Sequence, residues 1–205
     1  MMQVSKSKDN VILYTTTDGN PIPDKTNYAS GVNLISNTYE NGVGTLTFDG
    51  VITTIPNSAG FHGITTLESV EFPDSIVNFG YGLFNGCSGL KSVKLPQYIT
   101  RIDTYTFYST GLLTLEIPDG VTYIGTYCFM RSYNFKIFEL PASLTSIGRQ
   151  AFLSTAITDI KILNTTQKVN GAAYMFDNPI IRVPNALLSE YQADSNWNVY
   201  RLAGY

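Results

Sequence analysis

A repeated apolar pattern constrains the fold of this chain more than any other feature. The pattern is apolar-x-x-apolar-x-apolar-Pro, where x is any residue, and it recurs through the middle of the sequence. Its four complete copies are Leu67/Val70/Phe72/Pro73, Leu90/Val93/Leu95/Pro96, Leu112/Leu115/Ile117/Pro118 and Phe135/Phe138/Leu140/Pro141. A fifth copy at residues 157–162 has Leu163 in place of the proline. The copies begin 23 or 22 residues apart, so the chain repeats one structural unit in register.

Further apolar positions follow each proline at fixed distances. They lie three residues after it (Ile76, Ile99, Val121, Leu144), six after it (Phe79, Ile102, Ile124, Ile147) and eleven after it (Phe84, Phe107, Phe129, Phe152). A period of roughly 20–29 residues with this strand pattern is typical of a leucine-rich-repeat solenoid. We expect the proline to end each strand because it has no N–H to donate, and the four phenylalanines to stack as an aromatic spine.

These repeats predict the fold class. We expect an α/β leucine-rich-repeat solenoid that is mostly β, a right-handed curved coil with a parallel main sheet. In this prediction residues 1–10 are disordered, residues 11–42 form an N-terminal β cap, residues 43–163 form the repeats, and residues 164–205 form a degenerate last repeat and a C-terminal cap. One domain accounts for all 205 residues, because a solenoid grows one coil at a time.

The two ends of the chain have sequence signals of their own. Val11–Thr16 has the composition of a strand, and Asn41-Gly42 is a strong signal for a type I′ hairpin turn. We expect this hairpin to pair with the exposed edge of the first coil, which would otherwise invite aggregation. Near the C-terminus, residues 185–193 predict a short amphipathic helix with Asn185 as its N-cap, and Trp197 should pack behind it.

Glycines mark one corner of the coils. Gly80, Gly125 and Gly148 each follow the apolar residue six places after the proline. A bend that a side chain would crowd favours glycine. Asp103 takes this place in one coil, and we attribute its presence to the tolerance of Asp for unusual backbone conformations.

Composition argues against several classes of function. Only 14% of residues are charged, against roughly 25% in a typical domain, and a net charge of −3 provides no basic field for nucleic acid. No apolar run is long enough to span a membrane, and the first nine residues contain no export signal. Cys87 and Cys128 should lie two coils and roughly 10 Å apart. We therefore expect free thiols packed as small apolar groups rather than a disulfide or a redox pair.

The sequence offers no constellation typical of an enzyme. His62 is the only histidine, and a solvated corner residue is a simpler interpretation than a catalytic base. No Gly-rich phosphate loop, Cys-x-x-Cys pair or EF-hand loop is present. We therefore predict no catalytic, metal-binding or cofactor-binding residues.

A row of charged residues is the first candidate for binding. The two-residue period of a strand places the residue between the second and third pattern positions on the outer face. This row is Thr47, Glu71, Lys94, Glu116, Glu139, Lys161 and Arg182, and the row beside it is Thr45, Ser69, Ser92, Thr114, Ile137 and Asp159. Glu71 should attract Lys94 and Glu139 should attract Lys161, whereas Glu116 and Glu139 should repel each other. The row is therefore either a solvated charge ladder or a recognition surface on which Glu116 and Glu139 bind a cationic group of a partner.

A set of tyrosines is the second candidate. Tyr105 and Tyr127 each lie two residues before a spine phenylalanine, and Tyr108 and Tyr133 lie near them in the sequence. Exposed tyrosine provides rigid contact area with a polar tip, which suits protein or sugar. Partial burial at the corners of the coils is the alternative explanation.

The sequence closely resembles the BspA-like leucine-rich-repeat family of bacterial proteins. The resemblance rests on the repeated strand pattern, on the following Ile-Gly, and on the Phe-x-x-Cys stretch at Phe84-Asn-Gly-Cys87, and it covers roughly residues 43–205. It implies a curved solenoid and, for many members, display on the cell surface and adhesion to proteins or other cells. It brings no catalytic residues, because the family motif is structural throughout.

These observations lead to a hypothesis about function. We expect a non-enzymatic, adhesin-like repeat module, a monomer, that recognises a host or neighbouring-cell protein. A glycan-binding module and a structural spacer or appendage subunit are the alternatives. The family resemblance implies a surface or secreted location, although the chain shows no signal peptide.

Overall fold

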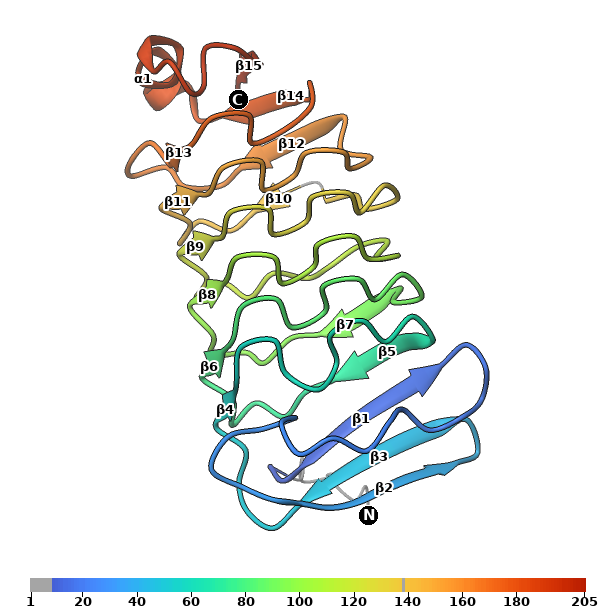
Figure 1. Cartoon of the computed structure of the whole chain (residues 1–205). Coiled ribbons are helices and arrows are strands. Elements are labelled where there is room, and N and C mark those ends of the chain that lie inside the picture. Colours follow the sequence, from blue (N-terminus) through green and yellow to red (C-terminus); the bar gives the residue numbers. More distant parts are fainter. Residues whose placement is uncertain (1–8, 138) are drawn as a thin grey trace, which may run out of the picture.

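The computed structural model describes residues 9–137 and 139–205, which form a stack of coils between two caps (Figure 1). Phe138 and most of the segment predicted to be disordered, residues 1–8, lie outside the described residues. Asp9 belongs to the same predicted segment, but it forms part of a turn and its carbonyl accepts a 2.7 Å hydrogen bond from the Ile52 nitrogen. The arrangement confirms the predicted solenoid.

The main strands of the coils stack in parallel along one side. They are β5 (Leu67–Glu71), β7 (Ser92–Lys94), β10 (Glu139–Leu140), β12 (Asp159–Ile162) and β14 (Ile180–Val183). Val70 pairs with Val93, one full repeat away, as the sequence pattern requires. Residues 112–118 form no regular strand, so the main sheet has two parts. The coil is still held, because the Leu113 nitrogen donates to the Lys91 carbonyl.

A second ladder of two-residue strands runs along the next corner. Its members are β4 (Thr54–Ile55), β6 (Asn78–Phe79), β8 (Arg101–Ile102), β9 (Tyr123–Ile124), β11 (Ser146–Ile147) and β13 (Asn170–Gly171). The glycines that follow these strands confirm the predicted crowding. A Cβ at Gly125 would lie 2.4 Å from the Thr104 nitrogen, and a Cβ at Gly80 would lie 2.5 Å from the Pro56 carbonyl carbon. Neither glycine has a positive φ, so close approach of the neighbouring coil rather than backbone conformation favours glycine there.

Asp103 interrupts this side ladder. The ladder divides into β4–β6 and β8–β9–β11–β13, and the break lies where Asp103 replaces glycine. The Gly125 nitrogen donates to the Ile102 carbonyl at 2.8 Å, but among residues 9–137 and 139–205 the equivalent bond from residue 103 to Phe79 is missing. The φ of Asp103 is not positive, so our explanation by backbone tolerance is wrong. The ladder is open where Asp103 takes the glycine position, whereas Ala172, at the equivalent place after β13, keeps its bond to the Ile147 carbonyl at 3.1 Å.

The predicted aromatic spine is present and buried. Phe84, Phe107, Phe129 and Phe152 have no solvent exposure. Their successive ring centroids are 5.4, 5.2 and 5.1 Å apart. Phe61 and Phe176 extend the stack at its two ends, at 5.6 and 5.0 Å. The spine is therefore a continuous core element, as the repeat predicted.

The backbone beside the spine is held in an unusual conformation. Residues two before and two after the spine phenylalanines have positive φ: Gly82, Tyr105, Tyr127 and Gln150 before, and Gly86, Ser109, Arg131 and Ser154 after. The nitrogens of Tyr105, Phe107 and Ser109 all donate to carbonyls of the next coil, at 3.1, 2.8 and 2.9 Å. The positive φ values therefore accompany a third ladder of backbone hydrogen bonds, and this ladder offsets the strain of a side chain at such positions.

The N-terminal cap is an antiparallel sheet of β1 (Val11–Thr16), β2 (Leu34–Glu40) and β3 (Val43–Phe48). The hairpin turn is as predicted, with φ of 51° at Asn41 and 82° at Gly42. The hairpin does not pair with the first coil, which corrects our expectation. The sheet order β2-β3-β1-β5-β7 places β1 between them, and β1 runs antiparallel to β5. The intervening strand supplies the antiparallel edge that protects the first coil.

The C-terminal cap combines a short helix and a last strand. A 3-10 turn (Asn185–Leu187) leads into α1 (Leu188–Ala193), and β15 (Arg201–Gly204) pairs in parallel with β14. Trp197 is fully buried and packs edge-on against Tyr191, as expected. Asn185 is not an N-cap, because its side chain makes no capping hydrogen bond. Its backbone nitrogen instead donates to the Tyr205 carbonyl, which ties the helix start to the last strand.

Candidate functional site

The charged row lies along the main sheet as predicted. Glu71 and Lys94 occupy paired positions of β5 and β7, and the Lys94 Nζ lies 2.5 Å from a Glu71 carboxylate oxygen. Hydrogen bonding to Glu71 raises the pKa of Lys94. Both side chains are about half exposed, so this pair adds little stability.

The C-terminal part of the row differs from a simple charge ladder. Glu139 pairs in register with Lys161, as predicted. The Lys161 Nζ, however, lies 4.1 Å from the centre of the Tyr205 ring, a cation–π contact that sequence reasoning missed. The neighbouring residues Asp159 and Arg182 form a bidentate ion pair, with its shortest contact at 2.7 Å.

Glu116 and Glu139 are the exposed acids of this row for which the described residues provide no ion-pair partner. Within residues 9–137 and 139–205, neither carboxylate forms an ion pair. A pocket of about 740 Å³ opens beside Glu116, where the main sheet is irregular. It is lined by Asp74, Val93, Lys94, Leu95, Gln97, Tyr98, Glu116, Ile117, Pro118, Asp119 and Gly120. The pocket thus has an apolar part and several carboxylates at its margin.

One member of the neighbouring row was placed on the wrong side. Ser69 and Ser92 pair in register, but Ile137 is only 6% exposed and joins the core. Burying an aliphatic side chain of this size is favourable by about 1.5–3 kcal/mol. The two-residue period therefore does not hold through this copy, whose second pattern position, Phe138, lies outside the described residues.

The tyrosines gather on the opposite, spine side of the coils. The rings of Tyr105 and Tyr127 stack with centroids 5.0 Å apart, and Tyr108 packs edge-on against Tyr105 at 5.5 Å. Tyr133 is 62% exposed, and Arg131 donates hydrogen bonds to its hydroxyl and to that of Tyr108. Sequence reasoning missed Arg131, because nothing in the repeat pattern marks that position as the bridge between two phenols.

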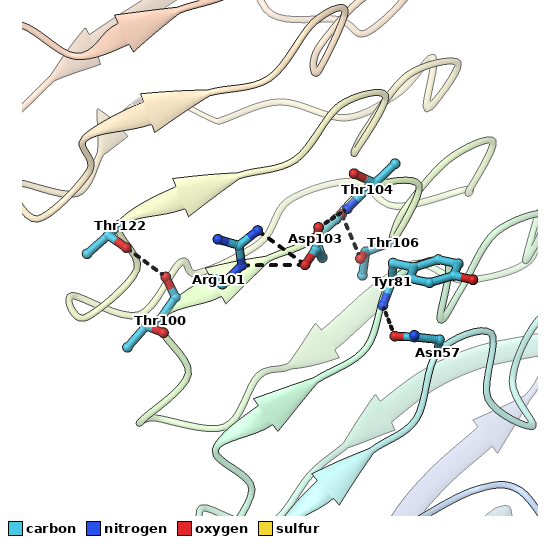
Figure 2. A network of polar contacts seen from close by, with 8 residues as sticks. All are labelled: Asn57, Tyr81, Thr100, Arg101, Asp103, Thr104, Thr106 and Thr122. Carbon is cyan, nitrogen blue, oxygen red and sulfur yellow. Dashed lines mark hydrogen bonds and ion pairs between the residues drawn. The ribbon is translucent and has the colours of Figure 1, made fainter.

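A smaller polar network surrounds the interruption of the side ladder (Figure 2). The Arg101 guanidinium lies 3.4 Å from an Asp103 carboxylate oxygen, whose partner oxygen accepts a 2.8 Å hydrogen bond from the Thr104 nitrogen. Arg101 also covers the Tyr123 ring at 4.1 Å. A shallow pocket of about 400 Å³ lies here, between β6 and β8. The side chains that line it largely satisfy one another.

Residues 53–180 match the family described as "BspA type Leucine rich repeat region", in six copies. The chain belongs to this family. Among solved structures it is similar to a leucine-rich repeat protein of T. pallidum, with a TM-score of 0.51 and 18% identity over 75% of this chain and 77% of that one. A leucine-rich repeat protein from Bacteroides ovatus ATCC 8483 is 15% identical over 98% of this chain and 67% of that one, with a TM-score of 0.35. No match was found among curated proteins.

Membership of the BspA-type family explains the buried residues but not the exposed ones. The repeat positions form the core, and repeats of this kind are typically non-enzymatic scaffolds that commonly mediate protein interactions. His62 is exposed, and in the described part of the chain no cluster of three potential metal ligands occurs. No helix among the described residues is long and apolar enough to cross a membrane.

The two cysteines of this BspA-type chain are free and buried, as predicted. Burial raises the pKa of the Cys87 thiol to about 12 and also raises that of Cys128. The Cys87 Sγ donates a 3.0 Å hydrogen bond to the Phe61 carbonyl. Thiols that stay protonated at neutral pH are poor nucleophiles, so both residues act as core side chains.

Proposed function

We propose that this protein is a non-enzymatic, adhesin-like binding module that recognises a host or neighbouring-cell protein through the main-sheet face. The observation that supports this proposal is the contrast within the charged row. Lys94 is neutralised by Glu71, and Lys161 is engaged by Tyr205, whereas Glu116 and Glu139 have no ion pair among the described residues. Exposed acidic side chains, one of which (Glu116) lines a partly apolar pocket, suit a Lys or Arg side chain of a partner protein.

A surface location is part of the same proposal. The family is associated with bacterial surface proteins, and an adhesin acts where it meets other cells. The sparsely charged, tyrosine-rich surface suits contact with a protein better than with nucleic acid, which requires a basic face.

The test compares charge removal on this face with charge removal elsewhere. A panel of purified extracellular matrix proteins is screened by surface plasmon resonance, and each binder is then measured against the double variant Glu116→Gln/Glu139→Gln. We expect on the order of tenfold weaker binding if a partner cation is desolvated between these residues. The control is Glu190→Gln, an exposed acid of α1 at the C-terminal end. Equal affinity of the double variant and the control for every binder would remove this face as the binding site.

Glycan binding is a second candidate, and the tyrosines of the spine side favour it, because Tyr105 and Tyr133 are exposed and Tyr105 stacks on the partly buried Tyr127. Aromatic side chains with polar tips suit sugars as well as proteins. A structural spacer is the third candidate. It would be indicated by self-association in analytical sedimentation together with no binding in either the protein screen or a glycan screen.

A further inference from the structure

Arg131 lies between an exposed phenol, Tyr133, and a partly buried one, Tyr108, in a way that leaves hydrogen-bond donors unused. Its Nε donates to the Tyr133 hydroxyl at 3.3 Å, and one terminal nitrogen donates to the Tyr108 hydroxyl at 3.4 Å. Guanidinium has five N–H groups, so three remain after these two bonds. Each phenol oxygen accepts from Arg131, so its own O–H is free to donate. The three side chains therefore present several donors at one place and no competing carboxylate.

The backbone fixes the positions of these donors. Arg131 has φ of 63°, and its nitrogen donates to the Leu153 carbonyl of the next coil at 3.0 Å. Tyr105 and Tyr127 also have positive φ, 58° and 57°, where the coil before them has Gly82. Bulky residues with positive φ are uncommon, and here they occupy the repeat positions whose nitrogens form the hydrogen-bond ladder beside the spine, which holds their backbone in place. We name the group of Tyr105, Tyr108, Tyr127, Arg131 and Tyr133 the tyrosine–arginine cluster.

Charge is distributed unevenly around this cluster. In the two coils from residue 112 to residue 156, the acids are Glu116, Asp119 and Glu139, all at the main strands or the turn that follows them. The spine-side segments 121–134 and 144–156 contain Arg131 and Arg149 and no Asp or Glu. Asp103, on the coil that carries Tyr105 and Tyr108, is paired with Arg101, so the cation that the cluster itself holds is Arg131.

We propose that the tyrosine–arginine cluster binds an anionic saccharide. The acidic group of the sugar accepts hydrogen bonds from Arg131 and from the hydroxyls of Tyr108 and Tyr133. The sugar ring and its hydroxyls contact the rims and hydroxyls of Tyr105 and Tyr127. A single arginine among several aromatic rings suits a sugar acid better than a phosphopeptide, which is usually held by clustered arginines. This inference deepens the glycan-binding candidate and is independent of the main-sheet proposal.

The test is a glycan array carrying neutral, carboxylated and sulfated saccharides, followed by calorimetry with the strongest binder and its neutral analogue. We expect signals confined to the anionic saccharides. Arg131→Gln should weaken binding on the order of tenfold to a hundredfold, the range for hydrogen bonds to a charged group. Tyr108→Phe/Tyr133→Phe should weaken it by about tenfold while keeping both rings. Glutamine already occupies a position of positive φ at Gln150, so it suits the backbone of residue 131.

Arg149→Gln is the matched control, because Arg149 is exposed on the same side and, within residues 9–137 and 139–205, its side chain forms no hydrogen bond with the cluster's hydroxyls. It should bind the saccharide as the wild type does, and so should Glu116→Gln/Glu139→Gln. Thermal unfolding of each variant checks that it is folded. Absence of saccharide binding, equal binding of neutral analogues, or equal affinity of the Arg131 and Arg149 variants would overturn the proposal. Tighter binding of a phosphotyrosine peptide than of any saccharide would overturn the ligand class.

Discussion

Replacing Gly125 with alanine should open the side ladder between β8 and β9. A Cβ at this position would lie 2.4 Å from the Thr104 nitrogen and 2.5 Å from the Asp103 carbonyl carbon. Both are backbone atoms, so the clash is relieved only if the coils separate. Separation lengthens or breaks the 2.8 Å hydrogen bond from the Gly125 nitrogen to the Ile102 carbonyl, whose equivalent at Ala172 is 3.1 Å. The natural interruption at Asp103 shows that the solenoid tolerates one such opening.

The expected magnitude follows from terms of opposite sign. Overpacking a close contact costs about 1–3 kcal/mol, and backbone groups that lose their partners cost about 1–3 kcal/mol more. Replacing glycine by alanine also stabilises the folded state by about 0.4–1 kcal/mol, because alanine lowers the conformational entropy of the unfolded chain. We therefore expect Gly125→Ala to lower the free energy of unfolding by about 2–4 kcal/mol, or the Tm by roughly 4–16 °C in a chain of this size.

Urea denaturation measures this loss, and hydrogen exchange locates it. The control is Gly120→Ala, where a Cβ would meet only the Ile99 carbonyl oxygen, at 3.5 Å. This variant should be as stable as the wild type or slightly more stable. Asp103→Gly should have the converse local effect, slower exchange of the residue 103 amide as its ladder bond forms. Equal stability of the two glycine variants would refute the steric explanation of the interruption.

Three further predictions concern the core, the thiols and the C-terminal cap. Phe107→Ala should lower the free energy of unfolding by about 3–5 kcal/mol, measured by urea denaturation; a loss under about 1 kcal/mol would show that the spine is not a core element. Cys87 and Cys128 should not react with a thiol reagent in the folded protein, because burial raises both pKa values, and two thiols should titrate after unfolding without reductant. The hydrogen bond from Lys168 lowers the pKa of Asp194 below its usual 3.8, so the stability that this group contributes is complete above the unfolded pKa and is lost as the pH falls through the folded value. Asp194→Asn should therefore lower stability by about 1 kcal/mol at pH 7, and the difference from wild type should shrink below about pH 4; a difference that is constant with pH would contradict the ion-pair explanation.

Much of the fold was predictable because one structural unit recurs with fixed spacing. The positions of Phe84 and Phe107 relative to their prolines place both on one axis, and a stacked spine follows from the period alone. The glycine corners at Gly80, Gly125 and Gly148 were predictable for the same reason, since in each of these coils the same corner faces the coil before it. The register of Glu71 with Lys94 required only a count of residues.

The errors occur where the repeat pattern carries no information. β1 precedes the repeats, so the repeat pattern does not indicate which strands it pairs with. Its antiparallel position between the hairpin and the first coil depends on tertiary packing. Ile137 turned inward because burying an apolar side chain outweighed strict alternation. The contacts of Arg131 with Tyr108 and of Lys161 with Tyr205 depend on how long side chains extend from one coil to another. The spacing of residues along the chain does not specify this.

The two interruptions of the backbone ladders have a mechanical consequence, because they occur at different coil interfaces. The side ladder is broken between the coils that begin at Leu67 and Leu90, where β5 and β7 remain paired. The main sheet is irregular at residues 112–118, where β8, β9 and β11 remain paired. Hydrogen bonds beside the spine cross all of these interfaces. An end-to-end pull would thus be carried by at least two rows of backbone bonds at each of these interfaces, because the two interruptions do not coincide in one plane across which the coils could shear apart.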